Sequence, residues 1–160
     1  MTTVRNINIG IREENLKKIN EILEIILADE LLMYVKIKNF HWNVVGVNFV
    51  EYHKFLDELA EESQETGDEV AERMRSLGVK VNATMKNYLA KGSVKEVESL
   101  DLTAAAMMEV LLDDYEKNIQ ALRVAIDKTE ALEDAGTADF LTSILEAKEK
   151  KAWMLRSMLA

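Results

Sequence analysis

Residues 48–77, NFVEYHKFLDELAEESQETGDEVAERMRSL, decide the fold of this chain. Small and apolar residues return every three or four positions, from Phe49 to Leu77. This spacing places them on one face of an α-helix, because a helix completes a turn in about 3.6 residues. Gly78 follows directly and is a typical helix terminator. The segment therefore predicts a long helix with one buried face.

The same periodicity predicts three more long helices, over residues 12–43, 103–131 and 137–159. The links at 44–47 and 133–136 are short, so each joins two antiparallel helices. The connection over residues 79–102 is long enough to cross the bundle, and Ser93 to Glu96 has the pattern of a capping box that starts a short helix. The sequence thus predicts an all-α, ferritin-like four-helix bundle with a short helix in the long middle crossover, as one domain over residues 1–160.

Composition supports a helical protein and excludes several classes of site. The chain has 48% hydrophobic residues, no Pro and six Gly, which favours long helices over a sandwich or barrel. It has no Cys, which excludes disulfides, thiolate metal sites and cysteine nucleophiles. The longest uncharged run covers only residues 39–50, whereas a membrane helix needs about 20 apolar residues. We therefore expect no membrane partner.

The charge balance points to cations as ligands. Lys and Arg number 20 against 29 Asp and Glu, which gives a net charge of −9. Such a surface repels phosphate backbones and anionic membranes. The first residues lack a basic segment followed by an apolar stretch, so we expect no signal peptide and a cytoplasmic location.

Two pairs of side chains within residues 48–77 have the spacing of metal ligands. His53 and Asp57 are four residues apart, as are Asp68 and Glu72, so each pair shares a helical face. The centres of the pairs are 15 residues apart, or about 22 Å along a helix. Metal–ligand bonds are about 2 Å long, so one ion cannot touch both pairs of one helix.

An antiparallel copy of the same helix resolves this separation. It sets His53 and Asp57 of one chain opposite Asp68 and Glu72 of the other, and twofold symmetry produces two such sites. His41, at the end of the preceding helix, can approach the same place. Imidazole and carboxylate ligands suit Fe(II), and also Zn(II) or Mn(II).

The residues themselves leave one alternative open and argue against another. Acidic residues four positions apart are commonly a solvated helix face, and a chain with 29 acids produces such pairs by chance. A di-iron centre inside one bundle would require Glu-x-x-His motifs. Lys38 and Val50 stand three positions before the two histidines, so we expect no such centre within one chain.

The motifs around these residues resemble those of a known family. Residues 38–46 read KNFHWNVVG, and His-x-x-x-Asp at 53–57 is followed by Asp-x-x-x-Glu-Arg at 68–73. This pattern is similar to that of the Dps family, the DNA-binding proteins from starved cells or mini-ferritins, and most to its acidic, tail-less, neutrophil-activating-protein-like members. The resemblance extends from about residue 15 to residue 160.

The resemblance implies a function and an assembly. Dps-type proteins form hollow shells of twelve subunits and act as ferroxidases, oxidising Fe(II) with hydrogen peroxide or oxygen between twofold-related subunits. They store the ferric mineral inside and so protect the cell from oxidative damage. The expected bound metal is iron, with zinc or manganese as possible substitutes.

The resemblance also implies roles for individual residues. One chain would supply His41, His53 and Asp57 to each site, and its mate would supply Asp68 and Glu72. Trp42 corresponds to a tryptophan near the family's centre that accepts an electron or radical; an aromatic residue that merely packs at the interface is the alternative.

The same comparison suggests roles for nearby charged residues. Lys38 would pair with a site carboxylate or lie free on the surface. Pore acids are expected among Glu133, Asp134 and Asp139, with Asp139 favoured. Glu58, Glu61, Glu62 and Glu65 would face a mineral cavity or lie on an exterior or interface surface.

The rival function is that of a nucleoid-associated protein that binds and compacts DNA. Family members that bind DNA often carry a basic terminal tail, but residues 1–10 hold a single charged side chain, Arg5. Twelve copies would carry about 12 × −9 charges, which opposes binding to a polyanion. We therefore expect direct DNA binding to be weak or absent.

Overall fold

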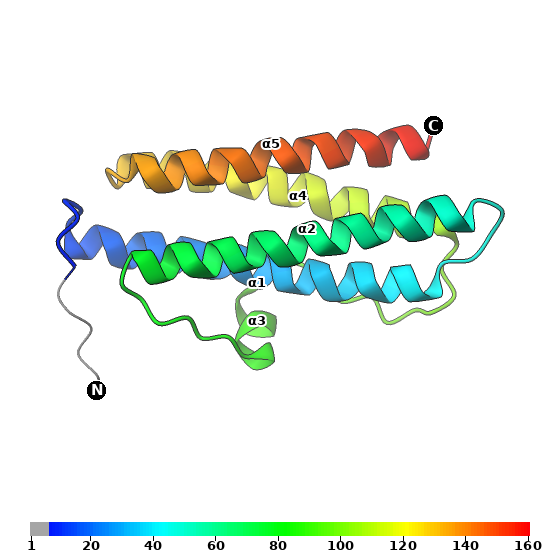
Figure 1. Ribbon diagram of the computed structural model, residues 1–160, viewed down its shortest axis with the longest axis horizontal. Helices are drawn as coiled ribbons and strands as arrows, with labels where there is room; N and C mark the ends of the chain where they lie inside the picture. Colours follow the sequence, from blue (N-terminus) through cyan, green and yellow to red (C-terminus); the bar gives the residue numbers. More distant parts are fainter. Residues whose placement is uncertain (1–6) are drawn as a thin grey trace.

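The computed structural model describes residues 7–160, and within that range the chain is helical with no strand. Four long helices lie side by side, and a short one lies outside the bundle (Figure 1). The helices are α1 (Glu13–Asn43), α2 (Phe49–Ser76), α3 (Met85–Lys91), α4 (Ala104–Ala131) and α5 (Ala135–Met158). The predicted all-α bundle is confirmed, while Arg5, the single charged side chain of residues 1–10, lies outside the described residues.

The connections have the predicted lengths and directions. Short links join α1 to α2 and α4 to α5, and each pair is antiparallel (Figure 1). The long connection after α2 returns along the bundle and carries α3, so that α2 and α4 run parallel. This is the crossover topology of ferritin-like bundles.

The short helix of the crossover does not lie where the capping box predicts it. Helix α3 begins after Thr84, whose Oγ1 accepts a hydrogen bond from the backbone N–H of Asn87 at 3.2 Å. Residues 93–96 are irregular instead, because the backbone N–H groups of Ser93 and Val94 donate to Asp29 Oδ1 of α1. The Ser93 hydroxyl also donates to Asp29 Oδ2 at 2.8 Å, so it is not free to cap a helix. The prediction at Ser93 was wrong.

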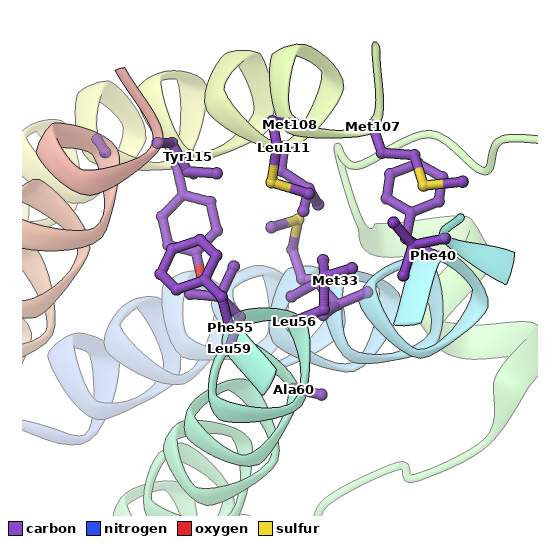
Figure 2. Close-up of a cluster of buried hydrophobic side chains, with 14 of the residues drawn as sticks. Met33, Phe40, Phe55, Leu56, Leu59, Ala60, Met107, Met108, Leu111 and Tyr115 are labelled. Carbon is purple, nitrogen blue, oxygen red and sulfur yellow. The ribbon is translucent and has the colours of Figure 1, made fainter. Parts of the chain in front are cut away.

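The core fills the space between the four long helices. One cluster of buried side chains surrounds Phe40, Leu56, Met108 and Tyr115 (Figure 2), and a second lies toward the opposite end of the bundle. The predicted small and apolar face of α2 is buried from Leu56 onward. Gly67 allows a close approach on this face, because a Cβ atom there would lie 2.8 Å from Leu31 Cδ2 and that side chain would have to shift.

Among residues 7–160, no helix combines the length and the apolar character that are needed to cross a bilayer.

Candidate metal centre

Both histidines of the chain meet where α1 ends and α2 begins. His41 lies in the last turn of α1 and His53 in the second turn of α2, and a short loop with the buried Val44 connects them. Gly46 in this loop has a φ of 133°, a conformation that favours glycine. The loop therefore returns the chain so that the two imidazole rings stack, with centroids 3.8 Å apart and an interplanar angle of 22°.

The two rings are fixed by a reciprocal pair of hydrogen bonds. His41 Nδ1 lies 2.9 Å from the carbonyl oxygen of His53, and His53 Nδ1 lies 3.0 Å from the carbonyl oxygen of His41. A carbonyl oxygen only accepts, so each Nδ1 carries the hydrogen. In the neutral rings each Nε2 then keeps its lone pair, which is the form that binds metal ions.

Asp57 completes this cluster from the next turn of α2. Its Oδ1 lies 3.7 Å from His41 Nε2 and accepts a hydrogen bond from Lys38 Nζ at 2.8 Å. That hydrogen bond is the largest cause of a lowered pKa at Asp57; partial desolvation opposes it, and the charge of Lys38 adds to the lowering. The carboxylate is therefore anionic at neutral pH, and Lys38 pairs with it rather than lying free.

Asp68 and Glu72 lie elsewhere on the same helix. Both are exposed on α2, and Asp68 is 11 residues beyond Asp57, or about 16 Å along the helix axis. Within the described part of the chain, no group of three or more His, Asp or Glu side chains is arranged to hold a metal ion. One chain thus brings together His41, His53 and Asp57 and leaves the other two predicted ligands apart.

An exposed apolar patch adjoins the histidines. Trp42 has 71% of its surface exposed, and its ring centroid lies 5.8 Å from Lys38 Nζ. We call the exposed side chains around it the loop patch; its members are Trp42, Val45, Val47, Phe49 and Val50. An apolar patch of this kind is typical of a surface that packs against another protein.

The contact between Phe49 and His53 was not predicted from the sequence. The ring of Phe49 lies 4.9 Å from the ring of His53, at an angle of 30°. Its four-residue spacing from His53 is the signal that predicts this contact. Phe49 thus links the loop patch to the imidazole pair.

The three predicted pore acids have different environments. Asp134 is buried and caps α5, because its Oδ1 accepts the backbone N–H of Thr137 at 3.0 Å and a hydrogen bond from Arg73 at 3.0 Å. This carboxylate is therefore occupied within the chain. Glu133 and Asp139 are exposed, and their role in a pore stays a prediction.

The predicted cavity acids also differ from one another. Glu58, Glu61 and Glu65 are exposed on α2. Glu62 is only partly exposed, and its Oε2 forms an ion pair with Lys151 Nζ of α5 at 2.9 Å. A role in mineral growth stays a prediction for all four.

Comparisons with known proteins agree with this architecture. A family model described as a ferritin-like domain matches residues 20–160. "DNA protection during starvation protein 2" of Bacillus anthracis is 38% identical, over 89% of this chain and 97% of its own length. The crystal structure of a Dps protein from Bacillus brevis has 33% identity and a TM-score of 0.89, covering 94% of this chain and 100% of that one. Dps from Listeria innocua, in a structure soaked with zinc, has 31% identity and a TM-score of 0.85, covering 88% and 95%.

Proposed function

This chain belongs to the ferritin-like family and, within it, to the Dps proteins, and from that premise we propose that it oxidises Fe(II) at sites shared by two chains and stores the ferric product. Iron storage and oxidation are the activities of the family. The shared site, the ligand set and the oxidant are the parts that belong to this proposal.

One observation carries the proposal: His41, His53 and Asp57 lie close together where α1 ends and α2 begins. The Nδ1 atoms of His41 and His53 face backbone carbonyl oxygens, which leaves their Nε2 atoms free of these hydrogen bonds, and the anionic Asp57 lies 3.7 Å from the first of them. Two neutral imidazoles and a carboxylate form an incomplete ligand set for a divalent cation. We propose that Asp68 and Glu72 of a second chain complete it, since hard carboxylate oxygens stabilise Fe(III) as it forms.

The substrates are Fe(II) and hydrogen peroxide, or oxygen in its place. With peroxide, two Fe(II) ions each give up one electron, the O–O bond breaks, and two hydroxide ions form. Lys38 holds Asp57 before iron arrives, and iron then competes with this ammonium for the carboxylate. Zinc and manganese ions bind the same types of donor atom and are expected to compete with Fe(II) for the site.

The assembly that we propose is a homododecamer built from twofold-related pairs. The loop patch supports this, because it places exposed apolar surface beside the half-site that needs a partner. Ferric mineral would collect in the hollow interior, which removes iron and peroxide together and limits oxidative damage. The absence of Cys from the sequence is compatible with the cytoplasmic location that we propose.

A complementation experiment tests the shared site. Fe(II) is mixed anaerobically with protein, peroxide or oxygen is added, and Fe(III) absorbance is followed for His53→Ala and for Asp68→Ala, each of which is expected to be slow. Chains of the two variants are then co-assembled in equal amounts. Half of the dimers are mixed and each has one intact site of two, so about a quarter of the parent rate should return.

The complementation experiment has a matched control and two outcomes that would contradict the shared site. Glu69→Ala, which changes an exposed acid on the same helix, should leave the rate unchanged. A site contained within one chain would give no recovery on mixing. Assembled single variants that oxidise iron as fast as the parent would refute the ligand assignment.

DNA binding is the rival function, and the charge of the chain opposes it. The net charge of −9 on each copy repels a polyanion. We therefore propose that direct binding is weak or absent at physiological salt. A gel-shift assay at neutral pH should show no complex, and a tight complex there would favour the nucleoid-associated function instead.

A further inference from the structure

The middle of the bundle holds ionisable side chains that the proposed reaction does not use. Every long helix contributes to this group, which we call the central cluster. Its members are Glu30 of α1, Glu62 of α2, Tyr115 of α4, and Lys148 and Lys151 of α5. Tyr115 extends from α4 toward α1 and α2, as Figure 2 shows.

The central cluster consists of paired charges. Lys148 Nζ lies 2.8 Å and 3.1 Å from the two carboxylate oxygens of Glu30, and both side chains are buried. Lys151 Nζ lies 2.9 Å from Glu62 Oε2 in a less buried position. The Lys148 ammonium is also 5.0 Å from the ring centroid of Tyr115. Two glutamates from facing helices are thus neutralised by two lysines from α5.

The two carboxylates are close enough to act on one another. Burial is the main cause that raises the pKa of Glu30, and Lys148 opposes it, while the charge of Glu62 adds to the increase. The charges of both glutamates also contribute to the raised pKa of Tyr115, after its burial. A cation is therefore needed here if Glu30 is to stay ionised.

Ferritin-like di-iron proteins fill the same part of the bundle with metal. There, inward glutamates on two helices combine with Glu-x-x-His motifs on the other two. In this chain the inward glutamates are present, but α5 supplies lysines three residues apart. A divalent ion that entered between the two glutamates would meet the Lys148 ammonium group, which is hydrogen-bonded to Glu30. The residues of this centre therefore do not fit a metal ion.

We propose that Lys148, supported by Lys151, is the resident cation of the central cluster and excludes divalent metal ions from it. The exclusion itself does not depend on the proposed reaction. Its consequence, that iron is oxidised only at the site between chains, rests on the proposed function. Lys148 is then a residue that determines where in the molecule iron binds.

Removal of the lysine charge provides the test. In a His53→Ala/Asp68→Ala background, which disables the proposed shared site, Mn(II) binding is measured by the loss of its free electron paramagnetic resonance signal. The background protein should bind no specific Mn(II). Adding Lys148→Met should create about one site per chain, and adding Glu30→Gln as well should abolish it.

Controls separate a local effect from a general change of charge. Lys150→Met removes an exposed lysine of the same helix and should create no site, and Lys148→Arg, which keeps the charge, should create none either. If Lys148→Met does not fold, Lys148→Gln replaces it, because its amide can hydrogen-bond to Glu30. Circular dichroism establishes that each variant is folded.

Two results would overturn the inference. One is a folded Lys148 variant that binds no Mn(II) above the background. The other is a Mn(II) ion already bound in the background protein and released by Glu30→Gln. A parent protein that fails to oxidise iron, together with the expected Mn(II) pattern, would refute the proposed function and leave this inference standing.

Discussion

At the residue scale, each histidine fixes the other's tautomer and orientation. The hydrogen bonds from Nδ1 to the opposite carbonyl oxygen join the end of α1 to the start of α2 through the same two residues that we propose as metal ligands. Ring stacking at 3.8 Å restricts rotation further. Little conformational freedom is therefore left to lose on metal binding, which is the advantage of a preorganised site.

Lys38 is predicted to hold the pKa of Asp57 below its ordinary value. Replacing it in Lys38→Met removes the hydrogen bond at 2.8 Å that is the largest cause of the lowering, so the pKa of Asp57 should rise toward 3.8. Carboxyl carbon chemical shifts in a metal-free pH titration measure this. Lys54→Met, which removes an exposed lysine from α2, the helix of Asp57, is the control. An unchanged Asp57 titration in Lys38→Met would show that the ion pair is not formed in solution.

Lys148 is predicted to be a major contributor to stability. Lys148→Met leaves Glu30 buried without its cation and should cost about 3–5 kcal/mol of unfolding free energy. The exposed Lys150→Met should change it by less than about 0.5 kcal/mol. Urea unfolding of both variants at neutral pH gives the comparison, and equal midpoints would contradict the burial argument.

The loss in Lys148→Met is predicted to depend on pH. The pKa of Glu30 in the folded chain is already raised above 4.5, and without Lys148 it rises further. Below pH 4.5 Glu30 is protonated in both the folded and the unfolded chain, so the loss of unfolding free energy in Lys148→Met is smallest there. As pH rises above 4.5 the unfolded chain releases this proton first, so the unfolding free energy falls until pH passes the folded pKa. Midpoints measured from pH 4 to 8 should therefore diverge from the parent as pH increases.

At the element scale, the start of α5 depends on one carboxylate. Asp134 caps α5 by accepting a hydrogen bond from the backbone N–H of Thr137, and it also accepts one from the guanidinium of Arg73 in α2. It therefore connects the α4–α5 link to a neighbouring helix. Asp134→Ala should cost about 1–3 kcal/mol, from the lost cap and the unpaired guanidinium. Asp139→Ala, on the exposed face of the same helix, should cost less than about 0.5 kcal/mol. Chemical unfolding midpoints test the difference.

The sequence predicts the elements well where the signal is local. The range 12–43 against the observed Glu13–Asn43, and 48–77 against Phe49–Ser76, follow from hydrophobic periodicity. The start of α3 was misplaced because Asp29, more than 60 residues away, takes the backbone donors of residues 93 and 94. No local pattern reports such a contact.

In the candidate site, too, some contacts follow from local sequence patterns and others do not. Four-residue spacing predicts that His53 and Asp57 share a helical face, and the position of His41 at the end of the preceding helix predicts that it approaches them. The exchange of hydrogen bonds between the histidine backbones and the pairing of Glu30 with Lys148 join residues that a sequence pattern does not associate. Tertiary packing decides both.

At the scale of the whole molecule, the proposed twofold symmetry would combine the four half-sites of two chains into two complete sites. The single chain holds its histidine half and its Asp68–Glu72 half about 22 Å apart, so neither half alone supplies the proposed ligand set. Assembly and activity are then coupled through one surface. Anything that separates the partners should abolish oxidation without altering either half.

The loop patch offers the way to separate them. Val47 is fully exposed in the single chain, so Val47→Asp should leave the bundle folded while it places a charge in the proposed contact. Analytical ultracentrifugation should show species smaller than the parent assembly, with unchanged helicity by circular dichroism and little Fe(II) oxidation. Val124→Asp adds the same charge to an exposed apolar position on α4 and serves as the control. Because the mutated residue is not a proposed ligand, the loss of oxidation would come from the loss of the partner. A Val47→Asp protein that keeps the parent size and rate would place the twofold contact on another surface and remove the loop patch from the proposal.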